Sequence, residues 1–429
     1  MRDRQSIDRR RFLLSSIGTA FVGLAGCSSD PTQNGPQSND TEETPPSTTT
    51  SSADTTGKTT EPSTDTTTDE QTSSSNSAEG HWPMYQFDAA NSGYRPDATG
   101  PTENVREKWR FKPDNRILDP IVADGTVYAR SFSFDLEENY LYSIDLTSGR
   151  ELWVFEEDQG ITYPVAADGT VYVGSPNGNL YAIEPSSGNS RWKFKEGEGN
   201  GLAPTVLDET IYFPTTDGNL YAVNTADGTE RWSYRIDDVF NRSPAVVNGT
   251  LYITSHNRLH ALDISTGSER WSYTDQEFGE MPAVINNSPV VANGTVYFGT
   301  DLHVYAVEAS NGNKRWRTEI SSAAFGTPAV ANKALYAGGG EPFLSLDSAT
   351  GDQLWNVELD SVAFTSPVVV DDIIYTNTVT VVYAMEASSG TELWRFKADN
   401  GLRDSIAVAD GTIYIGSDAG LYALESSDS

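Results

Sequence analysis

Short apolar segments alternate with turn residues through most of this chain, from about residue 106 to residue 425. Residues 161–194 show the pattern in four short segments rich in β-branched or aromatic side chains: Pro164–Ala167, Thr170–Val173, Asn179–Ile183 and Ser190–Phe194. Turn dipeptides separate these segments: Asp168-Gly169, Asn177-Gly178 and Ser187-Gly188. No stretch keeps a helical period, so the pattern predicts a protein built from short antiparallel strands.

One tryptophan marks each unit of the pattern. Eight Trp follow one another at intervals of 39 to 45 residues: Trp109, Trp153, Trp192, Trp232, Trp271, Trp316, Trp355 and Trp394. In seven units a Gly stands four residues before the Trp. Such a Gly indicates a positive φ or the close approach of a neighbouring group. Four strands in each unit of about 40 residues predict a β-propeller.

The first and last units of the repeat are incomplete in complementary ways. Trp109 has no upstream Tyr strand, and Tyr414 has no downstream Trp. We therefore expect residues 106–111 to supply the outer strand of the blade formed by residues 402–425. The predicted fold is all-β: an eight-bladed propeller with four antiparallel strands per blade, its ring closed by an N-terminal strand joining the C-terminal blade.

Two blades depart from the regular unit. Extra residues between Phe132 and Asn139 lengthen the first blade, and an insertion before Pro289 lengthens the fifth. His260 stands where most third strands carry Tyr. Because that position is a packing position, we interpret His260 as structural.

The first residues resemble an export signal. Arg9 and Arg10, followed by Phe12 and Leu13, match the core of a twin-arginine signal, and a weakly apolar stretch continues to Gly26. Cys27 follows in lipobox position and is the single Cys of the chain. We predict a lipoprotein signal over residues 1–26 and lipidation of Cys27; the alternative is a plain signal peptide with an incidental Cys.

The next segment has the composition of a disordered tether. Of the 52 residues from 28 to 79, 26 are Ser or Thr and ten are Asp or Glu. Such a sequence buries too little apolar surface to offset the entropy of ordering. The predicted organisation is a signal peptide (1–26), a tether (27–79), a lead-in segment (80–105), the propeller (106–425) and a tail (426–429).

The charge of the chain excludes some partners. With 29 Lys and Arg against 61 Asp and Glu, the net charge is −32, which disfavours nucleic acid. Lys accounts for only eight of the 29 cations. An acidic, Lys-poor surface is typical of very high salt and points to a halophilic archaeon; an ordinary acidic secreted protein is the alternative.

The repeat motif, as in Tyr181 to Trp192, resembles the tryptophan-docking repeat of the pyrroloquinoline-quinone-like propeller family. The lead-in His81–Asp88 is similar to the segment that precedes the first blade in that family. The resemblance covers roughly residues 81–425.

The resemblance implies one of two functions. Quinoprotein dehydrogenases of the family bind pyrroloquinoline quinone and calcium in the central funnel, with an adjacent Cys pair against the ring. Lipoprotein members, such as the propeller subunit of the outer-membrane assembly machine, bind no cofactor and act as scaffolds. The Cys pair is missing here. We therefore expect a non-enzymatic, membrane-anchored extracytoplasmic scaffold, with the quinone-dependent dehydrogenase as the alternative.

The sequence identifies no catalytic, cofactor-binding or metal-binding residue. It does place Arg116, Arg242 and Arg403 in connections between neighbouring blades, where they would share one face of the ring. This grouping predicts a face for an unknown protein partner or extracellular ligand, on a monomeric propeller. Local pairing of these cations with the abundant carboxylates is the alternative.

Overall fold

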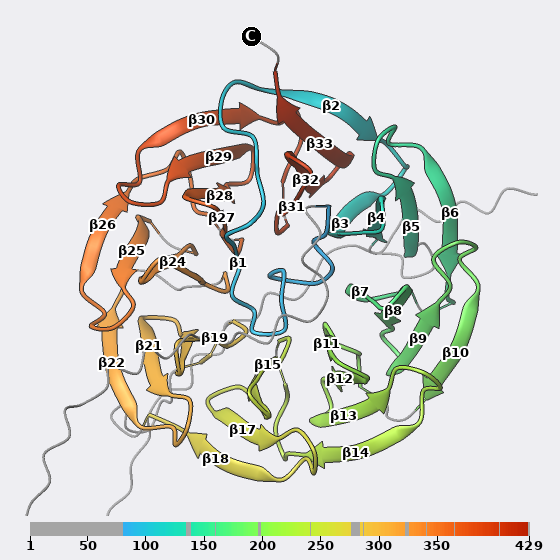
Figure 1. Ribbon diagram of the computed structural model, residues 1–429, viewed down its shortest axis with the longest axis vertical. Helices are drawn as coiled ribbons and strands as arrows, with labels where there is room; N and C mark the ends of the chain where they lie inside the picture. Colours follow the sequence, from blue (N-terminus) through green and yellow to red (C-terminus); the bar gives the residue numbers. More distant parts are fainter. Residues whose placement is uncertain are drawn as a thin grey trace, which may run out of the picture. The chain divides into compact units, whose positions relative to one another are not determined.

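The computed structural model describes residues 80–427 except 134–138, 159, 196–198, 241, 276–283, 286, 322–325, 340, 364 and 403. The predicted signal peptide, Cys27, the tether and Arg403 therefore lie outside the described residues. The described part is all-β and forms eight sheets of a propeller (Figure 1). It contains no helix of the length and hydropathy needed to cross a membrane.

Each blade is an antiparallel sheet whose first strand is innermost in the ring. Blades 1 and 2 consist of β3 (Arg116–Ala123), β4 (Thr126–Phe132), β5 (Tyr140–Asp145) and β6 (Glu151–Glu156), then β7 (Pro164–Ala167), β8 (Thr170–Gly174), β9 (Asn179–Ile183) and β10 (Ser190–Lys195). Blades 3 and 4 consist of β11 (Thr205–Leu207), β12 (Thr210–Pro214), β13 (Asn219–Asn224) and β14 (Glu230–Arg235), then β15 (Ala245–Val247), β16 (Thr250–Thr254), β17 (Leu259–Asp263) and β18 (Glu269–Tyr273).

The second half of the ring repeats this order. Blades 5 and 6 consist of β19 (Val290–Ala292), β20 (Thr295–Gly299), β21 (His303–Glu308) and β22 (Lys314–Glu319), then β23 (Ala329–Ala331), β24 (Ala334–Ala337), β25 (Phe343–Asp347) and β26 (Gln353–Val357). Blade 7 consists of β27 (Val368–Val370), β28 (Ile373–Asn377), β29 (Val381–Glu386) and β30 (Glu392–Lys397).

Blade 8 is made from two distant parts of the chain. Its inner strands are β31 (Ala407–Ala409), β32 (Thr412–Ser417) and β33 (Gly420–Ser426), and its outer strand is β2 (Val105–Phe111). β2 runs antiparallel to β33, with Trp109 opposite Ala423. This pairing is consistent with the closure expected from the sequence, although β2 starts one residue before the predicted boundary at 106.

Alternating strand directions give the ring two distinct faces. We call "inner-turn face" the face that carries the turn between the first and second strands of each blade, and "loop face" the opposite one. In blade 2 that turn is Asp168-Gly169, with φ of 47° and 65°. Two successive positive φ angles define the type I′ hairpin turn that this dipeptide predicts.

Each Trp side chain joins its blade to the next one. Seven of these side chains donate their Nε1–H to a backbone carbonyl of the following blade, and Trp394 donates to the carbonyl of Pro101 in the lead-in segment, all at 2.6–3.1 Å. The seven acceptors are Leu146, Pro185, Thr225, Ile264, Ala309, Ser348 and Ala387. The seven Gly of the repeat have φ of 69–77°. A Cβ on any of them would lie 2.5–2.8 Å from the ring of the Trp that comes from the preceding blade. The Gly is therefore required both by its positive φ and by the close approach of this ring.

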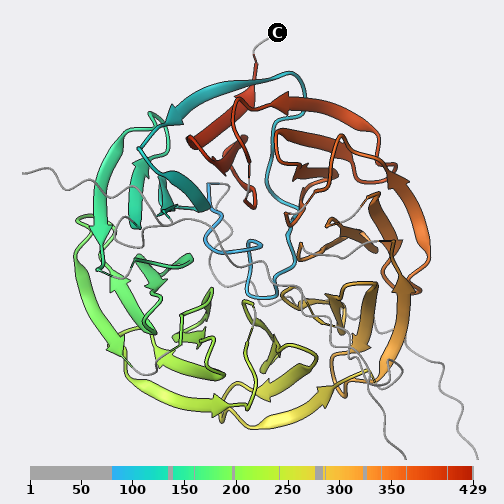
Figure 2. The same ribbon diagram turned by 180° about the vertical axis from the view of Figure 1, so that it is seen from behind.

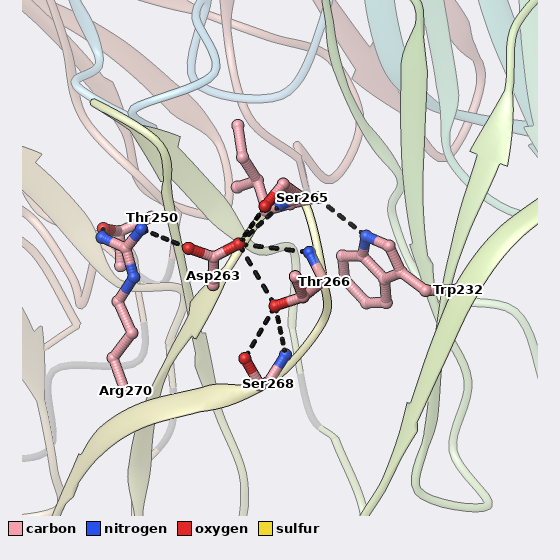
Figure 3. A network of polar contacts seen from close by, with 8 residues as sticks. Trp232, Thr250, Asp263, Ser265, Thr266, Ser268 and Arg270 are labelled. Atoms are coloured by element: carbon pink, nitrogen blue, oxygen red, sulfur yellow. Dashed lines mark hydrogen bonds and ion pairs between the residues drawn. The ribbon is translucent and has the colours of Figure 1, made fainter.

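Polar side chains hold the turn that receives each Trp. In blade 4, Asp263 accepts hydrogen bonds from the backbone N–H groups of Ser265 and Thr266 (Figure 3). Its other carboxylate oxygen pairs with Arg270, which also donates to Thr250 at 2.6 Å. The turn thereby presents the Ile264 carbonyl to Trp232 at 2.7 Å.

The lead-in segment runs across the middle of the ring (Figures 1 and 2). Six of its carbonyls accept N–H groups from the inner strands of six blades at 2.6–3.0 Å; the donors are Val122, Ala166, Val246, Val291, Val330 and Val369. Arg95 is fully buried and donates to the carbonyl of His81, which fastens the segment to itself. Tyr94 and Arg95 form β1, which pairs in parallel with β27.

Candidate functional site

Equivalent positions line the centre of the ring on its loop face. They are the residues three places before the central residue of each inner strand or its counterpart: Asp119, Tyr163, Ala203, Ser243, Ser288, Thr327, Ser366 and Ser405. Five of the eight are Ser or Thr. Their hydroxyls link neighbouring blades: Thr327 N–H donates to Ser366 Oγ at 2.9 Å, and Ser288 N–H to Thr327 Oγ1 at 3.1 Å. On this side of the ring the repeat is structural.

Tyr85 of the lead-in segment reaches this hydroxyl belt. Its hydroxyl lies 2.8 Å from Ser366 Oγ and donates to Thr327 Oγ1 at 2.9 Å. Burial raises the pKa of Tyr85, against the effect of these two hydrogen bonds. The Tyr85 side chain thus occupies the space beside blades 6 and 7.

Blades 1 and 2 carry Asp119 and Tyr163 in place of the hydroxyls, and together with Asp404 of blade 8, next to Ser405, they form a cluster of charged and aromatic side chains. Asp119 has a φ of 52° at an irregularity in the pairing of β3 with β4. Its N–H donates to the Asp404 carboxyl group, and its own carboxylate pairs with Arg130. The Arg130 guanidinium lies 5.0 Å from the centre of the Tyr163 ring. A positive φ in a non-Gly residue beside buried charge is a feature of functional sites.

Burial controls the protonation of this cluster. Burial, and then the neighbouring Asp119 charge, raise the pKa of Asp404 well above its ordinary value, although Arg130 opposes them. The Asp119 charge, followed by burial, raises the pKa of Tyr163 to about 12. Arg130 balances Asp119, so the cluster stabilises its own charges internally.

The predicted Arg residues behave differently from one another. Arg116 pairs with Asp418 at 2.6 Å and lies 5.8 Å from the Phe132 ring, as the local-pairing alternative predicts. Arg242 is exposed, and its charge lowers the pKa values of Tyr85 and Tyr163 against the effects that raise them. Both residues belong to the loop face; Arg403 is outside the described residues.

Arg130 was missed by the sequence analysis, although the repeat contains a signal for it. It stands two residues after the Tyr of the second strand, where the other blades carry Gly174, Pro214, Thr254, Gly299, Gly338, Asn377 and Gly416. A cation at a position that is otherwise small or neutral marks blade 1 as unusual. Asp119 breaks the Ser/Thr pattern in the same way.

His260 has the surroundings of a structural residue. Its Nδ1 lies 3.0 Å from Glu269 and its Nε2 lies 3.3 Å from Ser255. The Tyr234 and Phe240 rings pack against it at 6.2 and 6.3 Å. Burial lowers the pKa of His260, so the neutral ring is the buried form.

The residues at the centre of the ring do not fit a quinone and a divalent cation. The cluster already uses its carboxyl groups: Asp119 pairs with Arg130, and Asp404 accepts the Asp119 N–H. Arg130 already supplies the positive charge that neutralises the Asp119 carboxylate. Within the described ranges, no three His, Cys, Asp or Glu side chains are arranged to hold a metal ion.

Comparison with known proteins agrees with this architecture and defines its class, the pyrroloquinoline-quinone-like propellers. The chain belongs to the family described as outer membrane protein assembly factor BamB, whose profile matches residues 102–194 and 192–380. Among curated proteins, none matches the sequence.

Solved structures of different functions share the fold. BamB from Moraxella catarrhalis is 18% identical, with 75% of this chain and 99% of that one covered and a TM-score of 0.62. Quinohemoprotein alcohol dehydrogenase from Comamonas testosteroni is 14% identical, with coverages of 83% and 82% and a TM-score of 0.68. The computationally designed Ika8 protein is 12% identical, with coverages of 74% and 99% and a TM-score of 0.65. At these identities the likeness concerns the fold alone.

Proposed function

We propose that this chain is an exported, lipid-anchored β-propeller that acts as a non-enzymatic binding or assembly scaffold. The observation that carries the proposal is the lead-in segment, which fills the middle of the ring and hydrogen-bonds to six inner strands. A quinone-dependent dehydrogenase of this fold would use that space for its cofactor. The family, described as an outer membrane protein assembly factor, supports the same function.

A redox assay separates the scaffold from the dehydrogenase. The purified propeller is incubated with pyrroloquinoline quinone and calcium in high salt, and dye reduction is measured with primary alcohols. We expect no quinone-dependent reduction, because Arg130 and Tyr85 occupy the centre of the ring. Quinone-dependent reduction above the level of heat-unfolded protein would establish the dehydrogenase instead.

The proposed cellular location of the protein depends on its first 27 residues and needs a separate test. We propose twin-arginine export through Arg9 and Arg10, followed by lipidation of Cys27 in the membrane of a halophilic archaeon. The Cys27→Ser variant should appear in the medium rather than in the membrane fraction. Continued membrane attachment of that variant would exclude the lipid anchor.

We propose the loop face around Arg242 as the surface that captures a protein partner. Because an exposed charge mainly tunes association and specificity, Arg242→Glu should weaken capture from native membranes and leave the melting temperature nearly unchanged. The matched control is Arg395→Glu, a charge reversal on the outer strand β30, where the exposed Arg395 pairs with Glu392 of the same strand. Equal effects of the two variants would remove the loop face from consideration. The Arg116, Arg242, Arg403 triple Glu variant then tests the whole predicted group.

A further inference from the structure

A pocket of ≈ 220 Å³ lies on the inner-turn face between blades 1 and 2. By the same measure a single water needs only about 10–15 Å³, so the pocket has room for an amino-acid side chain. Its wall includes His81 and Pro83 of the lead-in segment, the turn residues Asp124 and Asp168, and Tyr128. The pocket is thus built where the lead-in segment meets the first two blades.

The walls of the pocket combine apolar surface with carboxylates at its edge. Pro83 and Pro185 contribute apolar ring surfaces, whereas Tyr128, also part of the wall, is 2% exposed and packs its ring against Trp153. Asp124 and Asp168 belong to the exposed turns of blades 1 and 2, and the Asp124 side chain is 67% exposed. His81 Nε2 lies 3.6 Å from Asp124 Oδ1. This arrangement suits a ligand with an apolar stem and a cationic end.

The charge of the turns between first and second strands is uneven, and the pocket lies among the acidic ones. The turns of blades 7, 8, 1, 2 and 3 carry seven exposed carboxylates: Asp371, Asp372, Asp410, Asp124, Asp168, Asp208 and Glu209. The same turns in blades 4 to 6 carry Asn248, Asn293, Asn332 and Lys333. A one-sided field of this kind attracts a basic partner and orients it toward the pocket.

We propose that this pocket binds the arginine side chain of a basic segment in a partner protein. The apolar stem of an arginine packs on apolar walls, and its planar guanidinium pairs with carboxylates through parallel hydrogen bonds. Pro83, Pro185 and Ala167 supply the apolar walls, and Asp124 with Asp168 supply the carboxylates. The proposal goes beyond the scaffold function, because it assigns a second binding surface on the face opposite Arg242.

The test uses short peptides as probes and the purified full-length chain. Acetyl-Gly-Gly-Arg-Gly-Gly-amide is titrated by saturation-transfer NMR, alongside the same peptide with citrulline or lysine in place of arginine. We expect binding of the arginine peptide in the millimolar range. The citrulline peptide, which keeps the shape but lacks the charge, should bind at least fivefold more weakly.

Three variants locate the binding. Asp124→Asn with Asp168→Asn should weaken the arginine peptide roughly tenfold, since each exposed ion pair changes affinity by a few-fold. Asp208→Asn with Glu209→Gln makes the same charge change in the blade 3 turn and should alter binding less than twofold. Ala167→Leu should fill the pocket and abolish binding; blade 3 already carries Leu207 at that position, so the fold accepts the larger side chain.

Several results would overturn the proposal. Equal binding of the arginine and citrulline peptides would show that the pocket does not recognise the positive charge. Tighter binding of the lysine peptide would show that it does not select the guanidinium group. Equal losses from the two double variants would mean that the general field of the face attracts the peptide without the pocket. Melting temperatures of all variants within about 2 °C of the parent exclude unfolding as the cause.

Discussion

The four antiparallel strands of each of blades 1 to 7 come from one continuous stretch of chain, whereas those of blade 8 pair residues that are more than 300 positions apart. The junctions between blades are nevertheless alike. Trp232 donates to the Ile264 carbonyl in a turn of the next blade, and Trp394 donates to the Pro101 carbonyl in the lead-in segment. The Tyr375 hydroxyl also donates to Pro101, at 3.0 Å. A backbone carbonyl in the right place is sufficient, whatever segment provides it.

This comparison predicts that the ring opens first at blade 8. Deletion of residues 1–79 should leave the melting temperature nearly unchanged, while deletion of 1–112 should lower it by about 10 °C or more. The longer deletion removes β2 with its ladder to β33, which exposes a strand edge, and also removes the lead-in segment with its hydrogen bonds to six inner strands, a total loss of several kcal/mol. Differential scanning calorimetry measures both.

A complementation experiment covers the case in which the longer deletion does not fold alone. A synthetic peptide of residues 80–112 is added during refolding, in parallel with a peptide of residues 80–104 that lacks β2. The melting temperature that only the longer peptide recovers is compared with that of the parent. Recovery supports closure by β2. Equal melting temperatures of the two truncations without peptide would contradict it.

The next largest effect should come from the tryptophans. Truncation of a buried Trp costs about 3–5 kcal/mol, and we expect Trp394→Ala to reach the upper end. Trp394 is 6% exposed and its loss also frees Pro101, whereas Trp232 is half-buried and joins two continuous blades. Urea unfolding should show a larger loss for Trp394→Ala, and limited proteolysis should cut the lead-in segment only in that variant. Equal losses of stability in Trp394→Ala and Trp232→Ala, with no new cleavage, would mean that the ring does not depend on the closing junction more than on the others.

A third effect concerns the contact between blades 8 and 1. The folded state raises the pKa of Asp404, so its contribution to stability is full below the ordinary Asp range and is lost as the pH rises through the folded pKa. Asp404→Asn should therefore raise the melting temperature at pH 7, by about 2–4 °C, and the gain should disappear near pH 4. Ser405→Ala, next in the chain, is the control. A gain that is the same at both pH values would contradict a raised pKa.

The smallest effect lies within blade 4, away from the closure. Burial lowers the pKa of His260, so the unfolded chain takes up a proton first and stability falls as the pH drops from about 7 to 5. Burial alone would raise the pKa of Glu269, but hydrogen bonds to His260 and Tyr234 lower it; its contribution is lost only below about pH 4.5. His260→Leu, which introduces the residue that blade 6 carries at the equivalent position, should remove the loss between pH 7 and 5. Persistence of that loss in the variant would exclude His260 as its cause.

The sequence predicted the eight blades because the repeat presents each position eight times. The Gly before each Trp could be assigned a positive φ and a close neighbour from that regularity alone. The same regularity could have identified Asp119 and Arg130, which break it, but their pairing was not foreseen. Asp119 meets Asp404 from 285 residues away, and no pattern along the chain reports such a distance.

The path of the lead-in segment across the ring could not be predicted from the sequence either. Residues 81–95 occur once and have no second copy with which to compare them. Their carbonyls take up the free N–H groups of six inner strands, a role that depends on backbone geometry rather than on side-chain type. Some of its side chains also bond to the blades, and these a motif could have marked: Tyr85 bonds to Ser366 and Thr327, and Asn91 donates to the carbonyls of Pro244 and Pro289.

The lead-in segment also sets the order in which the molecule can be completed. It is synthesised before every blade, yet its carbonyls accept N–H groups from residues that are made much later. Gly93 accepts from Val369, and Thr99 accepts from Gly411. The lead-in segment is therefore synthesised first but can complete its hydrogen bonds only last. A nascent chain that ends before blade 8 lacks some of its hydrogen-bond partners. Contacts of such long sequence separation fold slowly. Folding of this ring should show a late, rate-limiting step in which the centre becomes protected from hydrogen exchange only after all eight blades have formed.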